Sequence, residues 1–464
     1  MSFAHVLKDQ TYAMKPPPLA LKRIRRLPLF SPRLWLRRIA FWLGAVLVAL
    51  IALVFARLAD DAGEIFLKLL HVSRFLPLIV APLGILFSAF LTRKLFPGAQ
   101  GSGIPQVIAA IHSGDRAHMD AMLRLRTAFG KVLLTLVGLL AGASIGREGP
   151  TVQVSATIMY NLGRRLRLPR TEMLNALVLA GGAAGVAAAF NTPLAGVVFA
   201  IEELSHSFES RTSGLSLTAV IIGGVVSLAL QGNYTYFGVS TAILGFNAGW
   251  WAVLLCGVVG GLSGGAFAAL LVRAGKGMPG WLGRFMRDHP FAFAALCGLL
   301  IAVFGLLSNG SSYGTGYAQA RGLVEGRADV PLSYAALKFC ANVVSYLSGV
   351  PGGIFAPSLA VGAGIGQYLS HLVPAPSGAV VLLGMVAYFT GAVQAPITAT
   401  IIVMEMTANG NLTIPLLATA MLAYGSSRLI CRRPLYGALA RQFAPPAPRP
   451  GVRVVVAQGD PGDA

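Results

Sequence analysis

Three short stretches of the chain read Gly101-Ser102-Gly103-Ile104-Pro105, Gly146-Arg147-Glu148-Gly149-Pro150 and Gly353-Ile354-Phe355-Ala356-Pro357. Each combines a glycine-rich backbone with a proline and leads into an apolar run. Glycine lets the backbone approach a ligand closely, and proline favours the first turn of a helix. The free N–H groups of a helix start carry about half a positive elementary charge. The three stretches are therefore predicted to be helix N-termini that bind anions.

The composition places these motifs in a membrane. Hydrophobic residues make up 55% of the 464 residues, and charged residues make up only 12%. Apolar runs recur over residues 39–58, 75–91, 132–143, 214–230, 251–272, 291–307 and 380–393. This pattern predicts a polytopic, all-α membrane protein and argues against a soluble enzyme. Several runs are shorter than the roughly 20 residues of a full span, which is typical of re-entrant helices that line a protected cavity.

The net charge of +20 could suggest a nucleic-acid partner, but its distribution indicates a membrane. Basic residues gather on both sides of the apolar region. They are Lys8, Lys15, Lys22, Arg23, Arg25, Arg26, Arg33, Arg37 and Arg38 before it, and Arg432, Arg433, Arg441, Arg449 and Arg453 after it. Under the positive-inside rule both termini are expected in the cytoplasm, and no nucleic-acid partner is needed to explain the charge. The start of the chain is polar, so no cleavable signal peptide is expected.

The four cysteines predict no metal centre. Cys256, Cys297, Cys340 and Cys431 lie in or beside apolar runs, without a CxxC spacing or a paired histidine. Such thiols are typical of buried structural positions. We expect no metal and no cofactor apart from a transported ion.

An internal repeat organises the chain. Residues 101–106 resemble residues 314–319, Pro150-Thr151 resembles Pro357-Ser358, and residues 191–196 resemble residues 394–399. Two glutamates extend the last match, because Glu202 and Glu405 each follow the matching proline by the same interval. Paired interruptions in two halves of a hydrophobic chain point to a transport site at the interface between the repeats. The pattern leaves open whether the repeats are parallel or inverted.

The repeat and the chain ends divide the sequence into four parts. The predicted parts are a basic N-terminal arm over residues 1–38, a first membrane repeat over 39–235, a second over 236–440 and a short cytoplasmic tail over 441–464.

The set GSGIP (101–105), GREGP (146–150), GGIFAP (352–357) and a late Pro434-Leu435-Tyr436 resembles the CLC family of chloride channels and chloride/proton exchangers. The resemblance extends over residues 39–440. It implies a homodimer in which each subunit has its own anion pathway, built from two inverted repeats of tilted helices. Fewer than 30 residues follow Tyr436, so we do not expect the paired CBS domains of many eukaryotic members. The resemblance therefore implies a bacterial-type inner-membrane protein.

A dehydrated chloride needs several weak donors, because a transport site must both bind and release the ion. By resemblance, the hydroxyls of Ser102 and Tyr436 and the backbone N–H groups of Ile354 and Phe355 line the central anion site. Ser102 could otherwise be a turn hydroxyl, and Tyr436 an interfacial aromatic anchor. The remaining motif residues of the anion path are Gly103, Ile104, Pro105, Gly146, Arg147, Gly149 and Ala356. We expect Arg147 to raise the local potential or to brace its motif instead of contacting chloride.

Glu148 contradicts a simple anion site, because its carboxylate lies among the predicted positive helix ends. Such a group can act as a tethered competitor that blocks the path when ionised and leaves it when protonated. Chloride would displace the carboxylate, and the displaced group could take a proton. A structural carboxylate near a helix start is the alternative. By resemblance Glu148 is the external gating glutamate.

Glu203 is the candidate for the internal end of the proton route. Ionisable groups inside apolar runs are costly and functional by default. The repeat matches Glu202 to Glu405 and leaves Glu203 unpaired, and the resemblance assigns the internal proton glutamate to this second position. The alternative is a solvated glutamate at the membrane edge.

Two positions depart from the pattern of many bacterial relatives. Gln106 and Ile108 stand where acidic residues are common. Proton access is therefore expected to differ in detail, and Glu209, His206 and His112 are possible substitutes.

The resulting prediction is secondary active exchange of chloride for protons, with a passive CLC anion channel as the alternative. An enzyme acting on lipid phosphate is disfavoured, since the three motifs contain no histidine or aspartate to serve as an acid, a base or a nucleophile. The fluoride-exporting branch is disfavoured by the presence of Ser102 and Tyr436.

Overall fold

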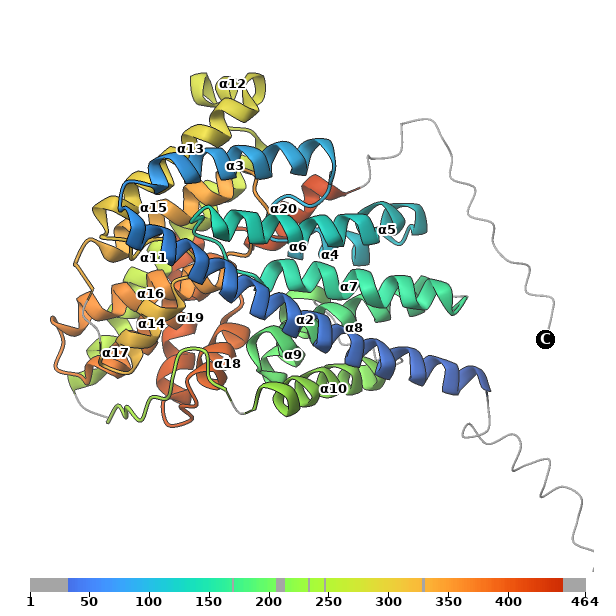
Figure 1. Ribbon diagram of the computed structural model, residues 1–464. Coiled ribbons are helices and arrows are strands. Elements are labelled where there is room, and N and C mark those ends of the chain that lie inside the picture. Colours follow the sequence, from blue (N-terminus) through green and yellow to red (C-terminus); the bar gives the residue numbers. More distant parts are fainter. Residues whose placement is uncertain are drawn as a thin grey trace, which may run out of the picture.

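The computed structural model describes residues 32–168, 171–205, 213–232, 234–245, 248–327 and 330–444. Over these residues the chain is a bundle of helices of very different lengths, and its only β-pairing is two isolated bridges (Figure 1). The predicted basic residues Lys8 to Arg26, Arg449 and Arg453 lie outside the described residues, as do the possible proton residues His206 and Glu209.

The first half of the chain contains nine α-helices and one π-helical turn among the described residues. They are α2 (Pro32–Val72), α3 (Pro77–Lys94), α4 (Ile104–Ser113), α5 (Arg116–Met122), α6 (Leu125–Leu140), α7 (Glu148–Arg165), α8 (Thr171–Phe190), α9 (Pro193–Phe199), the π-helical η2 (Ala200–Ser205) and α10 (Ser213–Gln231).

The second half repeats this order, except that α12 and α20 are added and α5 and η2 have no counterpart. Its elements are η3 (Ala248–Trp250), α11 (Trp251–Lys276), α12 (Gly280–Asp288), α13 (Pro290–Leu307), α14 (Tyr317–Val324), α15 (Tyr334–Leu347), α16 (Phe355–Ser370), α17 (Ser377–Val393), α18 (Pro396–Met406), α19 (Thr413–Ile430), α20 (Leu435–Ala440) and η4 (Arg441–Phe443).

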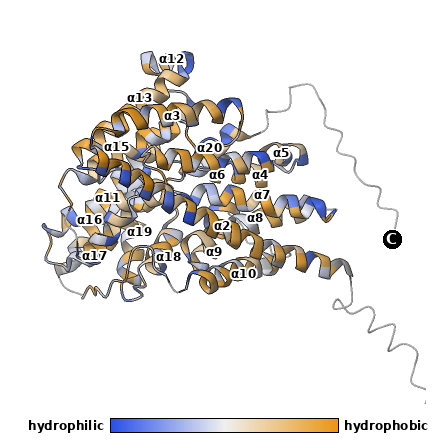
Figure 2. Ribbon diagram, in the orientation of Figure 1, coloured by the Kyte–Doolittle hydropathy of each residue, from blue (hydrophilic) through white to orange (hydrophobic). Residues whose placement is uncertain are grey.

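The helices have the lengths and composition of a multi-pass membrane protein. Within the described residues six of them are long and apolar enough to span a bilayer, namely α2, α3, α8, α10, α11 and α13, and α19 with α20 forms a further bent pair. Hydrophobic residues run along most helices, including those on the outside of the bundle (Figure 2). Helices such as α4, α9 and α14 are too short to span and must be covered by neighbours at membrane depth.

The predicted apolar runs correspond to helices α2, α3, α6, α10, α11, α13 and α17, with two differences. The helix α2 begins at Pro32, inside the predicted N-terminal arm that ended at residue 38. Apolar Leu34, Trp35 and Leu36 lie among its arginines, so the helix extends ahead of the uninterrupted apolar run. The glycine- and alanine-rich α8 is not among the predicted apolar runs, although it is long and apolar enough to span a bilayer and most of it is buried.

The two halves pack in the same way, which confirms the repeat. The long helix α2 packs against α8 and α10, and its counterpart α11 packs against α17 and α19. The halves meet where Gly146 and Gly353 exchange reciprocal backbone hydrogen bonds of 2.7 Å each. Reciprocal contacts of this kind are the mark of a two-fold axis. Because α7 and α16 begin at this pair and lead away from it, the repeats are inverted.

A second reciprocal contact joins α9 and α18. The carboxylate of Glu202 accepts hydrogen bonds from the backbone N–H groups of Ile397 (3.2 Å) and Thr398 (2.6 Å). Glu405 accepts the equivalent bonds from Leu194 (3.2 Å) and Ala195 (2.8 Å). Each glutamate therefore caps the N-terminus of the other repeat's helix, so the two glutamates that the repeat matches have an architectural role.

Candidate functional site

Helices α4, α7, α16 and α20 bring their N-terminal regions together in the interior of the protein. Gly103 precedes α4 in the left-handed conformation (φ 100°), and a Cβ atom there would lie 3.1 Å from the Gly149 carbonyl oxygen. A Cβ atom at Gly149 would lie 2.2 Å from the Ser102 hydroxyl oxygen and 3.2 Å from the Gly353 Cα. The three motifs therefore touch one another, and glycine is required for the contact.

Two buried hydroxyl groups lie at this junction. Ser102 and Tyr436 are 1% and 0% exposed, and neither hydroxyl has a hydrogen-bond partner among the described residues. Buried polar groups are normally hydrogen-bonded, so two buried hydroxyls without a protein partner indicate a ligand site. These two donors fit an anion such as chloride.

The start of α16 is fixed by an aromatic cage. The Phe355 ring packs against Phe190 (5.8 Å between ring centroids), Phe199 (6.0 Å), Phe389 (4.8 Å) and Tyr436 (6.0 Å). Aromatic pairs at these distances stabilise one ring orientation. The cage holds the backbone from Ile354 to Ala356 in place, and the first N–H groups of a helix have no partner within it. These N–H groups supply further donors beside the two hydroxyls.

Glu148 is the first residue of α7 and is fully buried. Its Oε1 atom accepts a hydrogen bond from the hydroxyl of Tyr317, the first residue of α14. Its Oε2 atom has no partner among the described residues and lies against Gly146, where a Cβ atom would be only 2.2 Å away. The structure therefore places a buried carboxyl group at the start of α7, next to the glycine motif that pairs with the start of α16.

Arg147 anchors the GREGP motif to α2. Its Nη1 atom donates hydrogen bonds to the Ala56 carbonyl oxygen and, at 2.5 Å, to Asp60 Oδ1 on α2. The guanidinium carbon lies 5.3 Å from the Tyr236 ring centroid and 5.7 Å from that of Tyr317. Asp60 is the acidic partner that sequence reasoning missed, because nothing near it in the chain connects it to the GREGP motif.

Glu203 lies on the π-helical turn η2 and is 2% exposed. Its Oε1 atom has no hydrogen-bond partner among the described residues, in contrast to the capping role of Glu202. Gln106 is also buried and donates to the carbonyl oxygen of Gln100 at 2.8 Å. His112 lies at the end of α4, with its Nδ1 atom 2.8 Å from the Ile108 carbonyl oxygen. Glu203, the candidate named from the sequence, is therefore a buried acid and not a solvated one at the surface.

Two buried lysines were also missed. Lys131 donates to the carbonyl oxygens of Gln100 and Gly101, the latter at 2.9 Å, and Lys338 donates to those of Ser312, Tyr313 and Gly314, the last at 2.7 Å. Both are fully buried, and each holds the glycine loop ahead of α4 or α14. The signal that could have found them is a lysine inside or beside an apolar helix.

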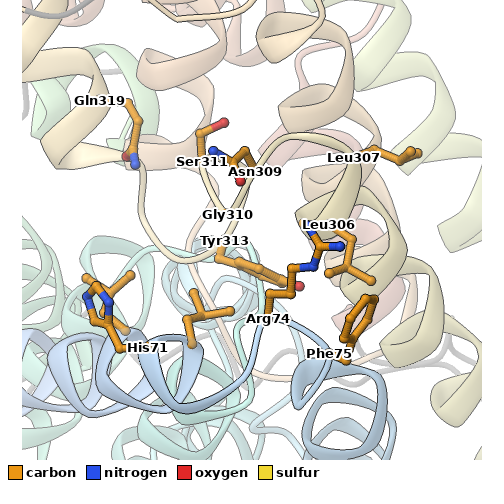
Figure 3. Close-up of a pocket in the computed structure, with 13 residues that line it drawn as sticks. His71, Arg74, Phe75, Leu306, Leu307, Asn309, Gly310, Ser311, Tyr313 and Gln319 are labelled. Atoms are coloured by element: carbon orange, nitrogen blue, oxygen red, sulfur yellow. The ribbon is translucent and has the colours of Figure 1, made fainter.

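A separate cavity of about 630 Å³ opens between the ends of α2 and α13. Figure 3 shows His71 and Arg74 on one side of it and Gln319, from α14, on another. None of its lining residues belongs to the three motifs, so it is distinct from the anion site. In the described part of the chain no group of histidine, cysteine and acidic residues could hold a metal ion.

Comparison with known proteins agrees with this geometry. Residues 84–428 match the family model described as voltage gated chloride channel. The H(+)/Cl(-) exchange transporters ClcA of Yersinia pestis and Yersinia pseudotuberculosis are each 34% identical to this chain over 402 aligned residues, which cover 79% of this chain and 79% of the relative.

Solved structures have the same fold. A slow cyanobacterial chloride/proton antiporter superposes with a TM-score of 0.73 at 22% identity, covering 88% of this chain and 97% of that one. A CLC-type fluoride/proton antiporter superposes with a TM-score of 0.71 at 25% identity, covering 86% and 97%. The match to the family model covers well over half of the chain, and the motifs that it brings together form one buried site. The chain is therefore a multi-pass membrane protein that belongs to the voltage-gated chloride channel (CLC) family.

Proposed function

We propose that this protein is a secondary active transporter that exchanges chloride for protons, with Glu148 as the gate in the anion path. The observation that carries the proposal is the buried Glu148 carboxyl group at the start of α7, beside the N-termini of α4 and α16. A carboxylate in a site built for anions competes with the transported ion. The names of the ClcA relatives, which describe H(+)/Cl(-) exchange, support the same function.

The proposed anion site consists of the Ser102 and Tyr436 hydroxyls and the N–H groups of Ile354 and Phe355. These are neutral donors, and none of them is a lysine or arginine. Neutral donors bind a dehydrated anion without holding it too tightly to leave. The motif residues around them act by allowing close backbone contact, as the Gly103 and Gly149 distances illustrate.

Glu203 is the proposed internal proton residue. It lies deep in the protein on a segment that follows α9, and one of its oxygens is free to accept or release a proton. The turn η2 that carries it packs against α4, the helix that begins with the GSGIP motif. Two separate carboxyl groups, one in the anion path and one beside it, are what a coupled exchange of two ions requires.

We also propose a homodimer in an inner membrane with both termini in the cytoplasm. Helices α9 and α18 are too short to span a bilayer, yet they carry exposed apolar side chains such as Leu194 (56%) and Ile397 (49%). The helices α10 and α19, which pack against α9 and α18, expose Ile221 (46%) and Ile414 (67%). A second copy of this face would cover the short helices. The arginines at the start of α2 support the cytoplasmic location of the N-terminus.

The test is ion flux in proteoliposomes that contain the purified protein. A chloride gradient should drive protons against their own gradient, because each chloride that passes displaces Glu148 and makes it available to a proton. Chloride flux without uphill proton movement would establish the passive channel instead.

A further inference from the structure

Tyr317 occupies a distinctive place in the repeat. It is the first residue of α14, preceded by Gly316 in the left-handed conformation (φ 82°), just as Ile104 follows Gly103 at the start of α4. The first repeat therefore brings an apolar side chain to this position, whereas the second brings a phenol. The phenol crosses the repeat interface and donates a hydrogen bond to Glu148 Oε1.

The Tyr317 ring is held firmly in place. It stacks on Tyr236, with 5.3 Å between ring centroids and 29° between planes, and it packs against Phe237 at 5.3 Å. The Arg147 guanidinium, itself bound to Asp60, lies 5.7 Å from the ring centroid. A hydroxyl on a ring that is fixed from several sides meets Glu148 with little loss of conformational entropy.

We propose that Tyr317 is a positioning residue that holds the ionised Glu148 carboxylate in the anion path and thereby sets the pH at which the path opens. The inference rests on the proposed gating role of Glu148. A hydroxyl that donates to a carboxylate favours the ionised form over the protonated form. The other charged and titratable groups near this site are Arg147 at the start of α7, Asp60 on α2, Tyr236 in the ring stack and Tyr436 on α20. The hydrogen bond to Glu148 comes from the hydroxyl of Tyr317.

The test is Tyr317→Phe, with passive chloride efflux from proteoliposomes measured as a function of pH. Loss of the donor favours the protonated gate, so the half-maximal pH of efflux should move upward by about one unit or more, the scale of one hydrogen bond to a charged group. One control variant should leave that pH unchanged. Gln319→Ala alters α14 on the side that faces the cavity in Figure 3.

A second pair of measurements isolates the hydrogen bond. Replacing Tyr317 by 3-fluorotyrosine keeps the shape of the side chain and makes its hydroxyl a stronger donor, so the half-maximal pH should move downward. In a Glu148→Gln background, Tyr317→Phe should add no pH shift. An unchanged profile in both Tyr317 variants, or an equal shift in the Glu148→Gln background, would overturn the proposal.

The outcome is separable from that of the proposed function, because passive efflux does not require proton coupling. If the unmodified protein moves no protons uphill while Tyr317→Phe shifts the efflux profile, exchange fails and the role of Tyr317 stands. If the unmodified protein exchanges ions and no Tyr317 variant moves the profile, the role of Tyr317 fails and exchange stands.

Discussion

Ser102 shows how a single residue links the sequence motif to anion chemistry. It lies between glycines whose close contacts leave its hydroxyl buried and without a protein partner in the described structure. The motif could be recognised from the sequence because glycine and proline act locally. Its contacts with Gly149 and Gly352 could not, because those residues are distant in the chain and reach the motif only through the packing of three helices.

The first prediction concerns selectivity at this residue. Ser102→Pro should shift preference from chloride toward nitrate by about tenfold or less, the scale of one hydrogen bond of about 1 kcal/mol. The shift follows from removing a donor that favours the smaller, more strongly accepting anion. Competition between the two anions during flux measurements tests it. An unchanged ratio in a folded variant would leave anion selectivity to the helix N-termini alone.

The second prediction separates the two adjacent glutamates. Glu203→Gln should abolish proton transport and retain chloride flux, because the side chain lies beside the anion path and loses only its capacity to exchange a proton. Glu202→Gln is the matched control, and it should be milder because Glu202 caps α18. Parallel proton and chloride flux assays on both variants provide the measurement. Equal loss of proton transport in the two variants would contradict the assignment.

At the scale of elements, the repeat explains both what the sequence predicts and what it misses. The starts of α4, α7 and α16 carry glycine and proline signals, so their positions follow from the sequence. The glycine- and alanine-rich α8 is apolar enough to span a bilayer, but its burial against α7 and α10 comes from packing that the sequence does not display. The partners of Glu148 are also tertiary, since Tyr317 lies 169 residues further along the chain.

The third prediction tests the reciprocal caps of α9 and α18. Glu405→Ala should lower the stability of the purified protein by about 1 to 3 kcal/mol, because it removes the charged acceptor of the Leu194 and Ala195 N–H groups. Thermal unfolding in detergent, followed by loss of monodisperse protein, is the measurement. Glu405→Gln keeps one acceptor oxygen and should be less destabilising. Wild-type stability in Glu405→Ala would show that the caps contribute nothing.

At the scale of the whole molecule, inverted repeats place two helix starts head to head. The reciprocal bonds between Gly146 and Gly353 define the axis, and the buried Ser102, Glu148 and Tyr436 side chains lie around it. The fold class and the family could be predicted from ordered motifs alone. The inverted arrangement could not be derived from the residue pattern, because direction appears only when the two helix starts are seen to pair.

The fourth prediction concerns assembly. The detergent-solubilised protein should have twice the 48.4 kDa mass of the chain, because in the proposed homodimer a second copy covers the apolar face over α9, α10, α18 and α19. Light scattering coupled to size-exclusion chromatography, with the detergent contribution subtracted, measures that mass. Ile221→Glu should lower it toward one chain, whereas Ile79→Glu, on the exposed surface of α3, should not. A single-chain mass for the unmodified protein would contradict the homodimer.

The most direct test of the account is chloride-driven proton uptake by Glu148→Gln beside the unmodified protein in proteoliposomes. We predict that the unmodified protein pumps protons uphill, whereas the variant retains anion flux and loses proton uptake, because the titratable occupant of the anion path is gone. Uphill proton uptake that persists in Glu148→Gln would contradict the gating role of this residue.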